Sequence, residues 1–288
     1  MKSKKLHGLV LALPTPLLKN EDVDIASMCR LIDHCVVEGA DGIMILGTIG
    51  EGVSLTDSQR RELIEKTVEH TAGRIPVLAT ISAASTRRSI EYAKAVEKSG
   101  VDYIVCTSAF YNKFPDPASL VYHIEKIAES VDLPLIFYNA PGFTGNPADT
   151  DTIDKILNME RIAGIKDSSC NFSAFVELLR RYPDKATRPG TIMQGDESVF
   201  DASLLMGADG VVSGGGVLFI SLVKRLLEAI ETGDQSTAIE LQQAFTKGLM
   251  NVLLPNVQRN WLYNIKKSLT EKGVIAHPYV TGPFMGGE

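Results

Sequence analysis

The feature that most constrains the fold is the repetition of short apolar runs along the chain. Eight can be counted, at residues 9–13, 42–46, 77–80, 103–106, 135–138, 163–166, 191–193 and 210–213. Runs of this length between turn residues are typical of strands buried on both faces, as in parallel sheets. The segments between them have helical features, such as the apolar stripe from Ile25 to Val36 and the capping box of Thr56 and Gln59. Strand and helix are therefore expected to alternate.

A short corner recurs three times where a helical segment meets an apolar run. It covers residues 39–43, 100–104 and 207–211, and each copy starts with glycine and has aspartate at its third position. Glycine suits the left-handed backbone that closes a helix. Because eight strands are expected and no Gly-x-Gly-x-x-Gly follows the first run, the sequence favours an α/β fold of the (β/α)8 TIM barrel type over an open sheet.

Strand-like runs cease after Phe219, and the apolar residues that follow have helical spacing. We therefore expect a catalytic barrel over residues 1–233 and a C-terminal helical extension over residues 234–288. The extension is predicted to be wholly helical from about Gln235 to Gly273, with Trp261 packed within it.

Composition excludes several classes of protein. The 288 residues include 29 Lys and Arg against 35 Asp and Glu, a formal net charge of −6, whereas a nucleic-acid-binding surface needs the opposite sign. No apolar stretch approaches the roughly 18 residues of a membrane-spanning helix. The cysteines form no Cys-x-x-Cys pair and no signal-peptide core follows the basic start, which indicates a reducing cytoplasm. The histidines lack metal-binding spacing, so no metal is expected.

The carboxyl ends of the strands are where such barrels carry their active sites. Lys166 ends the sixth apolar run and Tyr138 ends the fifth. A lysine held neutral in apolar surroundings condenses with a ketone to give an iminium, which accepts electrons from the adjacent carbon–carbon bond. A neighbouring tyrosine can transfer protons. On position alone, a lysine that merely extends its amine to solvent remains the simpler interpretation.

Three further strand ends carry candidate binding groups. The loop 47–50 could present backbone N–H groups to a carboxylate, with an added hydroxyl from Thr48. Ser213 and the three glycines after it could bind phosphate, although no basic residue lies nearby. Asp196 and Glu197 could accept hydrogen bonds from sugar hydroxyls, or simply begin the next helix. A plain connecting loop remains the alternative for each.

Four motifs, taken in order, resemble the dihydrodipicolinate synthase / N-acetylneuraminate lyase family over nearly the whole chain. They are Gly47-Thr48-Ile49-Gly50-Glu51, Tyr111 with Asn112, Tyr138-Asn139-Ala140-Pro141 with Thr144-Gly145, and Gly164-Ile165-Lys166-Asp167. The resemblance implies a (β/α)8 barrel, usually a homotetramer, that needs no cofactor and forms a Schiff base with pyruvate or another 2-oxo acid.

The resemblance also implies roles for individual residues. Lys166 would be the Schiff-base lysine and Tyr138 the general acid/base. Thr48 would belong to the carboxylate loop and to a hydroxyl relay reaching Tyr138, which Tyr111 would complete. In the synthases the tyrosine at this position is donated by an adjacent subunit. The remaining substrate-binding positions implied are Gly47, Ile49, Gly50, Ser168, and the pair Asp196 and Glu197, which matches the pair that holds the sugar tail in sialic acid lyases.

Two residues depart from the family pattern. Ile49 stands where the carboxylate loop often has a second hydroxyl residue, so carboxylate binding would depend more on backbone N–H groups. Phe143 stands where the synthases carry an arginine that binds the carboxylate of aspartate semialdehyde. A phenyl ring cannot form charge-assisted hydrogen bonds, so the synthase reaction is disfavoured.

The lead interpretation is a Schiff-base lyase that reversibly cleaves a 2-oxo-3-deoxy sugar acid, or a related 4-hydroxy-2-oxo acid, to pyruvate and an aldehyde. Four alternatives stay open. They are dihydrodipicolinate synthase despite Phe143, a sugar-acid dehydratase that uses the same iminium, a weakly catalytic carboxylate sensor suggested by Ile49, and a phosphate-binding barrel suggested by the glycines at 214–216.

Overall fold

The expected strands are all present in the computed structural model of the chain, which describes residues 5–254 and 261–284. Their bounds are β1 (Gly8–Ala12), β2 (Gly42–Ile45), β3 (Val77–Thr80), β4 (Tyr103–Thr107), β5 (Leu135–Asn139), β6 (Ile162–Asp167), β7 (Thr191–Gln194) and β8 (Gly210–Ser213). The bounds expected from the sequence differ from these by no more than one residue at either end.

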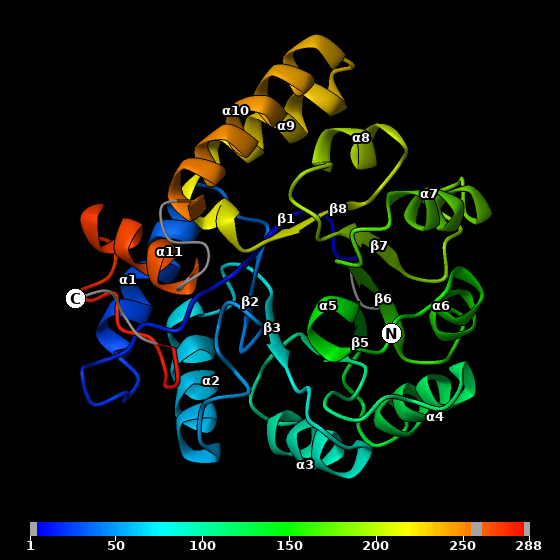
Figure 1. Cartoon of the computed structure of the whole chain (residues 1–288), viewed down its shortest axis with the longest axis horizontal. Coiled ribbons are helices and arrows are strands. Elements are labelled where there is room, and N and C mark those ends of the chain that lie inside the picture. The colour runs from blue at the N-terminus through cyan, green and yellow to red at the C-terminus, as the bar shows by residue number, and fades with distance from the viewer. Residues whose placement is uncertain (1–4, 255–260, 285–288) are drawn as a thin grey trace. The chain divides into compact units, whose positions relative to one another are not determined.

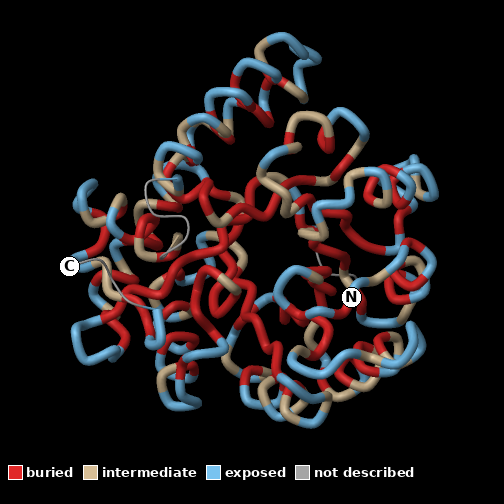
Figure 2. The backbone as a smooth tube through the Cα atoms, in the orientation of Figure 1, coloured by how far each residue is buried: buried red, intermediate tan, exposed pale blue. Residues whose placement is uncertain are grey.

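The strands follow one another from β1 to β8 around a closed barrel, and the paired strands run parallel. The predicted (β/α)8 fold is therefore confirmed. Almost every strand residue is buried, whereas the helices alternate buried and exposed positions (Figure 2). This difference explains why the strands read as continuous apolar runs and the helices as stripes.

Helices occupy the connections between the strands and follow the last strand, β8 (Figure 1). Their bounds are α1 (Ile25–Val37), α2 (Asp57–Thr71), α3 (Thr86–Val96), α4 (Pro117–Ala128), α5 (Pro141–Thr144), α6 (Thr150–Leu157), α7 (Phe172–Arg181), α8 (Phe200–Leu205), the 3₁₀ turn η1 (Gly215–Leu218), α9 (Ile220–Glu231), α10 (Gln235–Leu253) and α11 (Trp261–Glu271). The predicted capping box is confirmed at α2, where the Gln59 N–H donates to Thr56 Oγ1 and the Thr56 N–H to Gln59 Oε1.

The chain divides into two compact units. The first comprises residues 1–8 and 78–212, and the second comprises residues 9–77 and 213–288. In the first unit β4 to β7 pair side by side, with α6 packed against α4, α7 and β6. In the second unit α1 packs on α2, and α10 packs on α9 and α11. The Phe219 and Phe245 rings meet edge to face within this second unit, with centroids 5.9 Å apart.

The predicted helical extension consists of α10 and α11 in the described part of the chain. Residues 255–260, which fall inside the segment predicted as wholly helical, lie outside the described residues. Trp261 is the first residue of α11 and is half-buried. Across the described ranges, none of the helices combines the length and the apolar character that crossing a membrane requires.

Candidate active site

Tyr138 and Lys166 lie side by side in the first unit. They occupy matching register positions on β5 and β6, each one residue before the end of its strand. Lys166 Nζ lies 4.1 Å from the centroid of the Tyr138 ring. Tyr138 is 4% exposed and Lys166 is 5% exposed, so the amine does not extend into bulk solvent. The simpler interpretation of Lys166 from the sequence is therefore wrong, and the two leading candidates are brought together.

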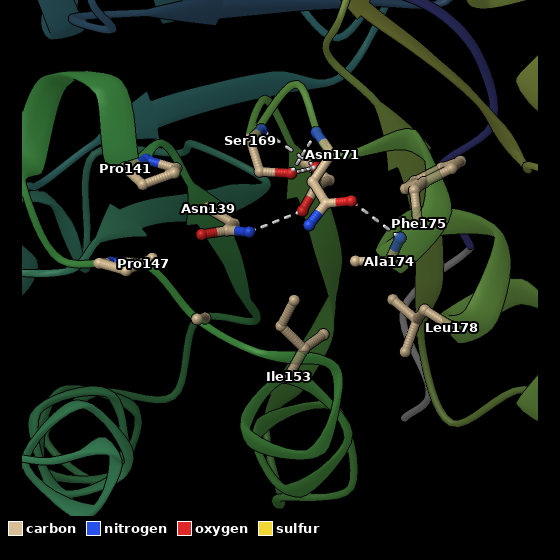
Figure 3. A pocket seen from close by; sticks show the side chains of 11 residues that line it. Asn139, Pro141, Pro147, Ile153, Ser169, Asn171, Ala174, Phe175 and Leu178 are labelled. Atoms are coloured by element: carbon tan, nitrogen blue, oxygen red, sulfur yellow. Dashed lines mark hydrogen bonds between the residues drawn. The ribbon is translucent and has the colours of Figure 1, made fainter.

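The next residue on each of these strands points to the opposite face, because side chains alternate along a strand. Asn139 Nδ2 donates to Asp167 Oδ2 at 2.7 Å, across the β5–β6 pair (Figure 3). Asp167 also accepts hydrogen bonds from the backbone N–H and the hydroxyl of Ser169. Burial raises the pKa of the Asp167 carboxyl, and these hydrogen bonds partly oppose the rise. Asn139 and Asp167 belong to the family motifs but were given no role of their own, although polar residues that directly follow two catalytic candidates were a usable signal.

Gly195, directly after β7, provides space beside the lysine. A Cβ atom there would lie 2.9 Å from Lys166 Cε and would overlap Ser168 Oγ. Ser168 therefore lies near the Lys166 side chain, and its substrate-binding role stays a prediction. The Gly195 N–H donates to the Asp167 carbonyl at 2.6 Å, which fixes the β7 end against β6. Gly195 was not predicted as a site residue, because its role depends on contacts between strands that are distant in sequence.

The other substrate-binding candidates of the first unit lie on connecting segments. Asp196 and Glu197 follow β7 and are half-buried, and Asp196 Oδ1 accepts hydrogen bonds from the backbone and hydroxyl of Ser198. Asp196 therefore stabilises the turn before α8. Phe143 lies on the short helix α5, directly after β5, and is 61% exposed.

Tyr111 lies on the segment after β4 and is 93% exposed, so in a single chain it is not brought into the Tyr138 and Lys166 pair. Its backbone is in the left-handed region, with φ 77°, which is unusual for a residue other than glycine. Buried Asn146 holds the segment by donating to the carbonyls of Ala109 at 2.8 Å and Asn112 at 3.0 Å, and by accepting from the Phe114 N–H. The exposed position of Tyr111 is thus a fixed one.

The predicted carboxylate loop, Gly47 to Gly50, lies in the second unit directly after β2. Thr15 Oγ1 donates to the Gly50 carbonyl at 2.6 Å. A Cβ at Gly50 would lie 3.0 Å from both the Leu13 carbonyl oxygen and the Leu46 nitrogen, so a side chain there would crowd the backbone of the loop. Thr48 is half-buried, whereas Ile49 is buried with its Cδ1 close to Gly214. Ile49 therefore packs against the loop that follows β8.

Glu51 anchors the end of this loop to the C-terminal extension. Its carboxylate pairs with the ammonium of Lys266 on α11 and accepts from the backbone N–H and the hydroxyl of Thr281, at 2.7 and 2.8 Å. Lys266 Nζ also donates to the Tyr279 carbonyl at 2.7 Å. Both charged side chains are almost completely buried. Burial lowers the pKa of Lys266, and the Glu51 charge opposes that shift.

Ser213 ends β8 in the same unit and is completely buried. Its Oγ accepts a hydrogen bond from the Gly216 N–H at 2.8 Å. One backbone donor of the glycine run is therefore engaged within the protein. In residues 5–254 and 261–284, no group of three or more His, Cys, Asp or Glu side chains is placed to hold a metal ion.

Comparison with known proteins gives a match over nearly the whole chain. The sequence model of the dihydrodipicolinate synthetase family matches residues 5–287. A 4-hydroxy-tetrahydrodipicolinate synthase of Oceanobacillus iheyensis is 34% identical over 232 residues, which are 81% of this chain and 77% of the relative. Another protein of that name, from Chloroherpeton thalassium, is 30% identical over 280 residues, which are 97% of this chain and 90% of the relative.

Solved structures also resemble the chain over nearly its whole length. Dihydrodipicolinate synthase from Aquifex aeolicus is 27% identical, with a TM-score of 0.88 over 98% of this chain and 93% of that one. CdNal from Clostridium difficile, solved in complex with mannosamine, is 23% identical, with a TM-score of 0.90 over 99% of this chain and 95% of that one. The second likeness shows a shared fold.

Proposed function

Because the chain belongs to the dihydrodipicolinate synthetase family, we propose that Lys166 forms a Schiff base with the ketone of pyruvate or of a pyruvate-derived acid. Membership makes the chain an enzyme of the pyruvate-dependent, Schiff-base-forming lyase and aldolase type. The observation that carries the proposal is the buried contact between the Lys166 amine and the Tyr138 ring, at 4.1 Å.

The proposed cleavage proceeds in balanced steps. The Lys166 amine adds to C2 of the substrate and water leaves, which gives an iminium. Tyr138 removes the proton of the C4 hydroxyl, the C3–C4 bond breaks, and its electrons move into the iminium to leave an enamine and a free aldehyde. Protonation of the enamine at C3 and addition of water then release pyruvate and restore the amine. The loop 47–50 is proposed to bind the C1 carboxylate, as the family resemblance implies.

For the aldehyde half we propose a partner whose binding does not require a carboxylate–arginine pair, as in the cleavage of a 4-hydroxy-2-oxo acid or 2-oxo-3-deoxy sugar acid. The supporting residue is Phe143, which replaces the arginine of the synthases and is 61% exposed on α5. An arginine–carboxylate pair is bidentate and charge-assisted, and phenylalanine offers no donor for it.

The synthase reaction is the second candidate, and the sequence relatives favour it over the lyase. All those described above carry the name 4-hydroxy-tetrahydrodipicolinate synthase, at 30% and 34% identity. In the direction of condensation both reactions begin with a pyruvate Schiff base, and they differ in the aldehyde that accepts it.

An acceptor panel separates the candidates. The enzyme would be supplied with pyruvate and either aspartate semialdehyde or a series of hydroxyaldehydes. Condensation would be monitored as the consumption of pyruvate. We expect the parent enzyme to turn over hydroxyaldehydes. We also expect a Phe143→Arg variant to gain activity toward aspartate semialdehyde. Efficient turnover of aspartate semialdehyde by the unaltered enzyme, with none of the hydroxyaldehydes, would establish the synthase instead.

A further inference from the structure

A buried, hydrogen-bonded pair of side chains lies directly behind the two catalytic candidates. Asn139 and Asp167 are the last residues of β5 and β6, and they are register partners, as Tyr138 and Lys166 are one position earlier. Because side chains alternate along a strand, the two pairs lie on opposite faces of the same strand ends. On the helix-facing side, Asn139 Nδ2 donates to Asp167 Oδ2 at 2.7 Å (Figure 3). A side-chain hydrogen bond therefore connects the two strands that carry the amine and the phenol.

Asp167 is also the residue at which three strand ends are held together. Its Oδ1 accepts from the backbone N–H and the hydroxyl of Ser169, at 3.1 and 2.6 Å, which fixes the turn that leaves β6. Its carbonyl accepts from the Gly195 N–H, directly after β7, at 2.6 Å. The hydrogen bond from Asn139 adds the end of β5. A displacement of Asp167 would therefore shift Lys166, its neighbour in the chain, relative to β5 and β7.

Stability alone does not account for this pair. Asn139 is 2% exposed, and its Oδ1 has no hydrogen-bond partner in the described part of the chain, which is unfavourable for a buried acceptor. Asp167 is 4% exposed, and burial raises the pKa of its carboxyl, because the charged form is desolvated there. The surrounding side chains are largely apolar, with Ile153, Phe175 and Leu178 among them. Two apolar side chains of the same size would suit these surroundings with little loss of stability, so the polar pair points to another purpose.

A hydrogen bond differs from apolar packing in being directional. It weakens steeply when its angle or its length changes, so it fixes the separation and the orientation of the strand ends that carry it. The catalytic candidates depend on this geometry, because Lys166 Nζ lies 4.1 Å from the centroid of the Tyr138 ring. A displacement of about 1 Å between reacting groups can lower a rate roughly a hundredfold. Supporting hydrogen bonds behind such groups hold them to within about 0.5 Å.

We propose that Asn139 and Asp167 are positioning residues for the Schiff-base reaction, and that their hydrogen bond holds the Tyr138 phenol and the Lys166 amine at the separation that proton transfer requires. The inference rests on the proposed function, in which Lys166 forms the iminium and Tyr138 transfers the proton. Neither Asn139 nor Asp167 is a catalytic residue, because both side chains lie on the opposite face of the strands. Loss of the hydrogen bond should slow proton transfer and leave the addition of Lys166 to pyruvate largely intact.

Condensation of pyruvate with glyceraldehyde, or with aspartate semialdehyde if the parent enzyme uses it faster, measures the effect in the whole chain. Borohydride trapping with pyruvate alone counts the chains in which Lys166 forms an adduct, and kcat is expressed per such chain so that unfolded enzyme does not contribute. Asn139→Leu removes the donor at nearly constant volume. We expect kcat to fall by about tenfold to a hundredfold, with trapping retained and KM for pyruvate little changed. The apolar pair Asn139→Leu/Asp167→Leu, which leaves no buried charge without a partner, should show the same fall.

A double-mutant cycle with Tyr138→Phe separates positioning from a general loss of structure. If Asn139 acts through the phenol, Asn139→Leu should have almost no further effect on kcat in the Tyr138→Phe background. A structural defect of the whole site would lower kcat by the same factor in both backgrounds. Equal factors would therefore overturn the proposal.

The exchanged pair Asn139→Asp/Asp167→Asn is the conservative variant, because the amide and the carboxylate swap strands and the hydrogen bond between the two positions can form again. It should recover most of the activity that Asn139→Leu loses. Asn20→Leu is the matched control, since Asn20 Nδ2 donates to Asp22 Oδ2 at 2.6 Å at an exposed site of the second unit, and its kcat should equal that of the parent. A folded exchanged pair that is as slow as Asn139→Leu would contradict the proposal.

The trapping measurement distinguishes a failure of this inference from a failure of the proposed function. No adduct at Lys166 in the parent would contradict the proposed function and remove the inference with it. An adduct at Lys166 in the parent and in the variants, with kcat unchanged by the loss of the Asn139 donor, would contradict the inference alone.

Discussion

At the scale of single residues, the proposed chemistry depends on two side chains that could be predicted from the sequence. It also depends on contacts between residues that could not be predicted from it. Lys166 and Tyr138 could be predicted because each is a polar residue near the end of an apolar run, and strand ends of one barrel meet at one rim. Gly195 could not be predicted, because glycine is required there by Lys166 on β6 and by Ser168 directly after β6, both distant from it in sequence. The unused acceptor of Asn139 likewise depends on which donors surround it in three dimensions.

The Tyr138→Phe variant tests the proton-transfer role. Removal of the phenolic hydroxyl leaves the ring beside Lys166 but eliminates the group that transfers protons. We expect kcat to fall by about a hundredfold to ten-thousandfold, the usual contribution of a positioned acid–base group, with little change in stability. Steady-state kinetics and thermal melting measure the two effects. Full activity in this variant would show that another group transfers the proton.

At the scale of secondary-structure elements, periodicity was sufficient for the strands and the long helices. The capping box at α2 could be recognised because it depends on residues only three positions apart. Neither the burial of His123 nor the ion pair of Glu51 with Lys266 could be predicted. In each case the partner comes from an element that is distant in sequence: Thr86 for the histidine and α11 for the glutamate.

His123 on α4 is expected to make stability depend on pH. Its ring is buried, with Nδ1 2.9 Å from Thr86 Oγ1, and burial lowers the His123 pKa to about 4. The unfolded chain therefore binds a proton near pH 6.5, whereas the folded chain does so only near pH 4. The neutral, buried ring therefore leaves the folded state fully stable above pH 6.5. As the pH falls toward 4, the free energy of unfolding decreases by up to about 3 kcal/mol.

Denaturant unfolding of the parent and of His123→Asn between pH 4 and 8 measures this effect. The parent should lose stability more steeply than the variant below pH 6.5, because only the parent carries the buried ring. Parallel curves for the two proteins over this interval would contradict the assignment.

The ion pair between Glu51 and Lys266 connects the end of the loop 47–50 to the C-terminal extension, so the extension helps to hold this loop in place. Lys266→Met would leave the Glu51 carboxylate buried without its cation, and we expect a loss of about 3–5 kcal/mol in the free energy of unfolding. Lys267→Met is the matched control, because Lys267 is solvent-exposed and lies 3.9 Å from Glu271, and it should change stability by less than about 1 kcal/mol. Equal effects of the two substitutions would show that the buried pair contributes no more than an exposed one.

At the scale of the whole molecule, the sequence predicted the barrel but could not show how copies of it assemble. Tyr111 is the residue that bears on this question, since it is held on a fixed segment and exposed in a single chain. We propose that chains assemble as a homotetramer and that Tyr111 of one chain completes the site of its neighbour, as the family resemblance implies. The residues of a short motif do not by themselves show whether a side chain acts in its own chain or in a neighbouring one.

Mixed oligomers test this assignment. The variants Tyr111→Phe and Lys166→Ala should each be nearly inactive alone. When they are co-expressed, a chain with Lys166 intact can receive Tyr111 from its neighbour, so part of the parental activity should return. No recovery in mixed oligomers, isolated with separate affinity tags, would mean that Tyr111 does not act across an interface.

The most direct test of the account is reduction of the enzyme with borohydride in the presence of pyruvate, followed by peptide mass spectrometry. We predict a mass gain of one reduced pyruvate located at Lys166, its absence in Lys166→Ala, and its retention when the exposed Lys155 on α6 is replaced by alanine. An unmodified Lys166 at saturating pyruvate, or an adduct on another lysine, would contradict the central claim that Lys166 is the Schiff-base residue.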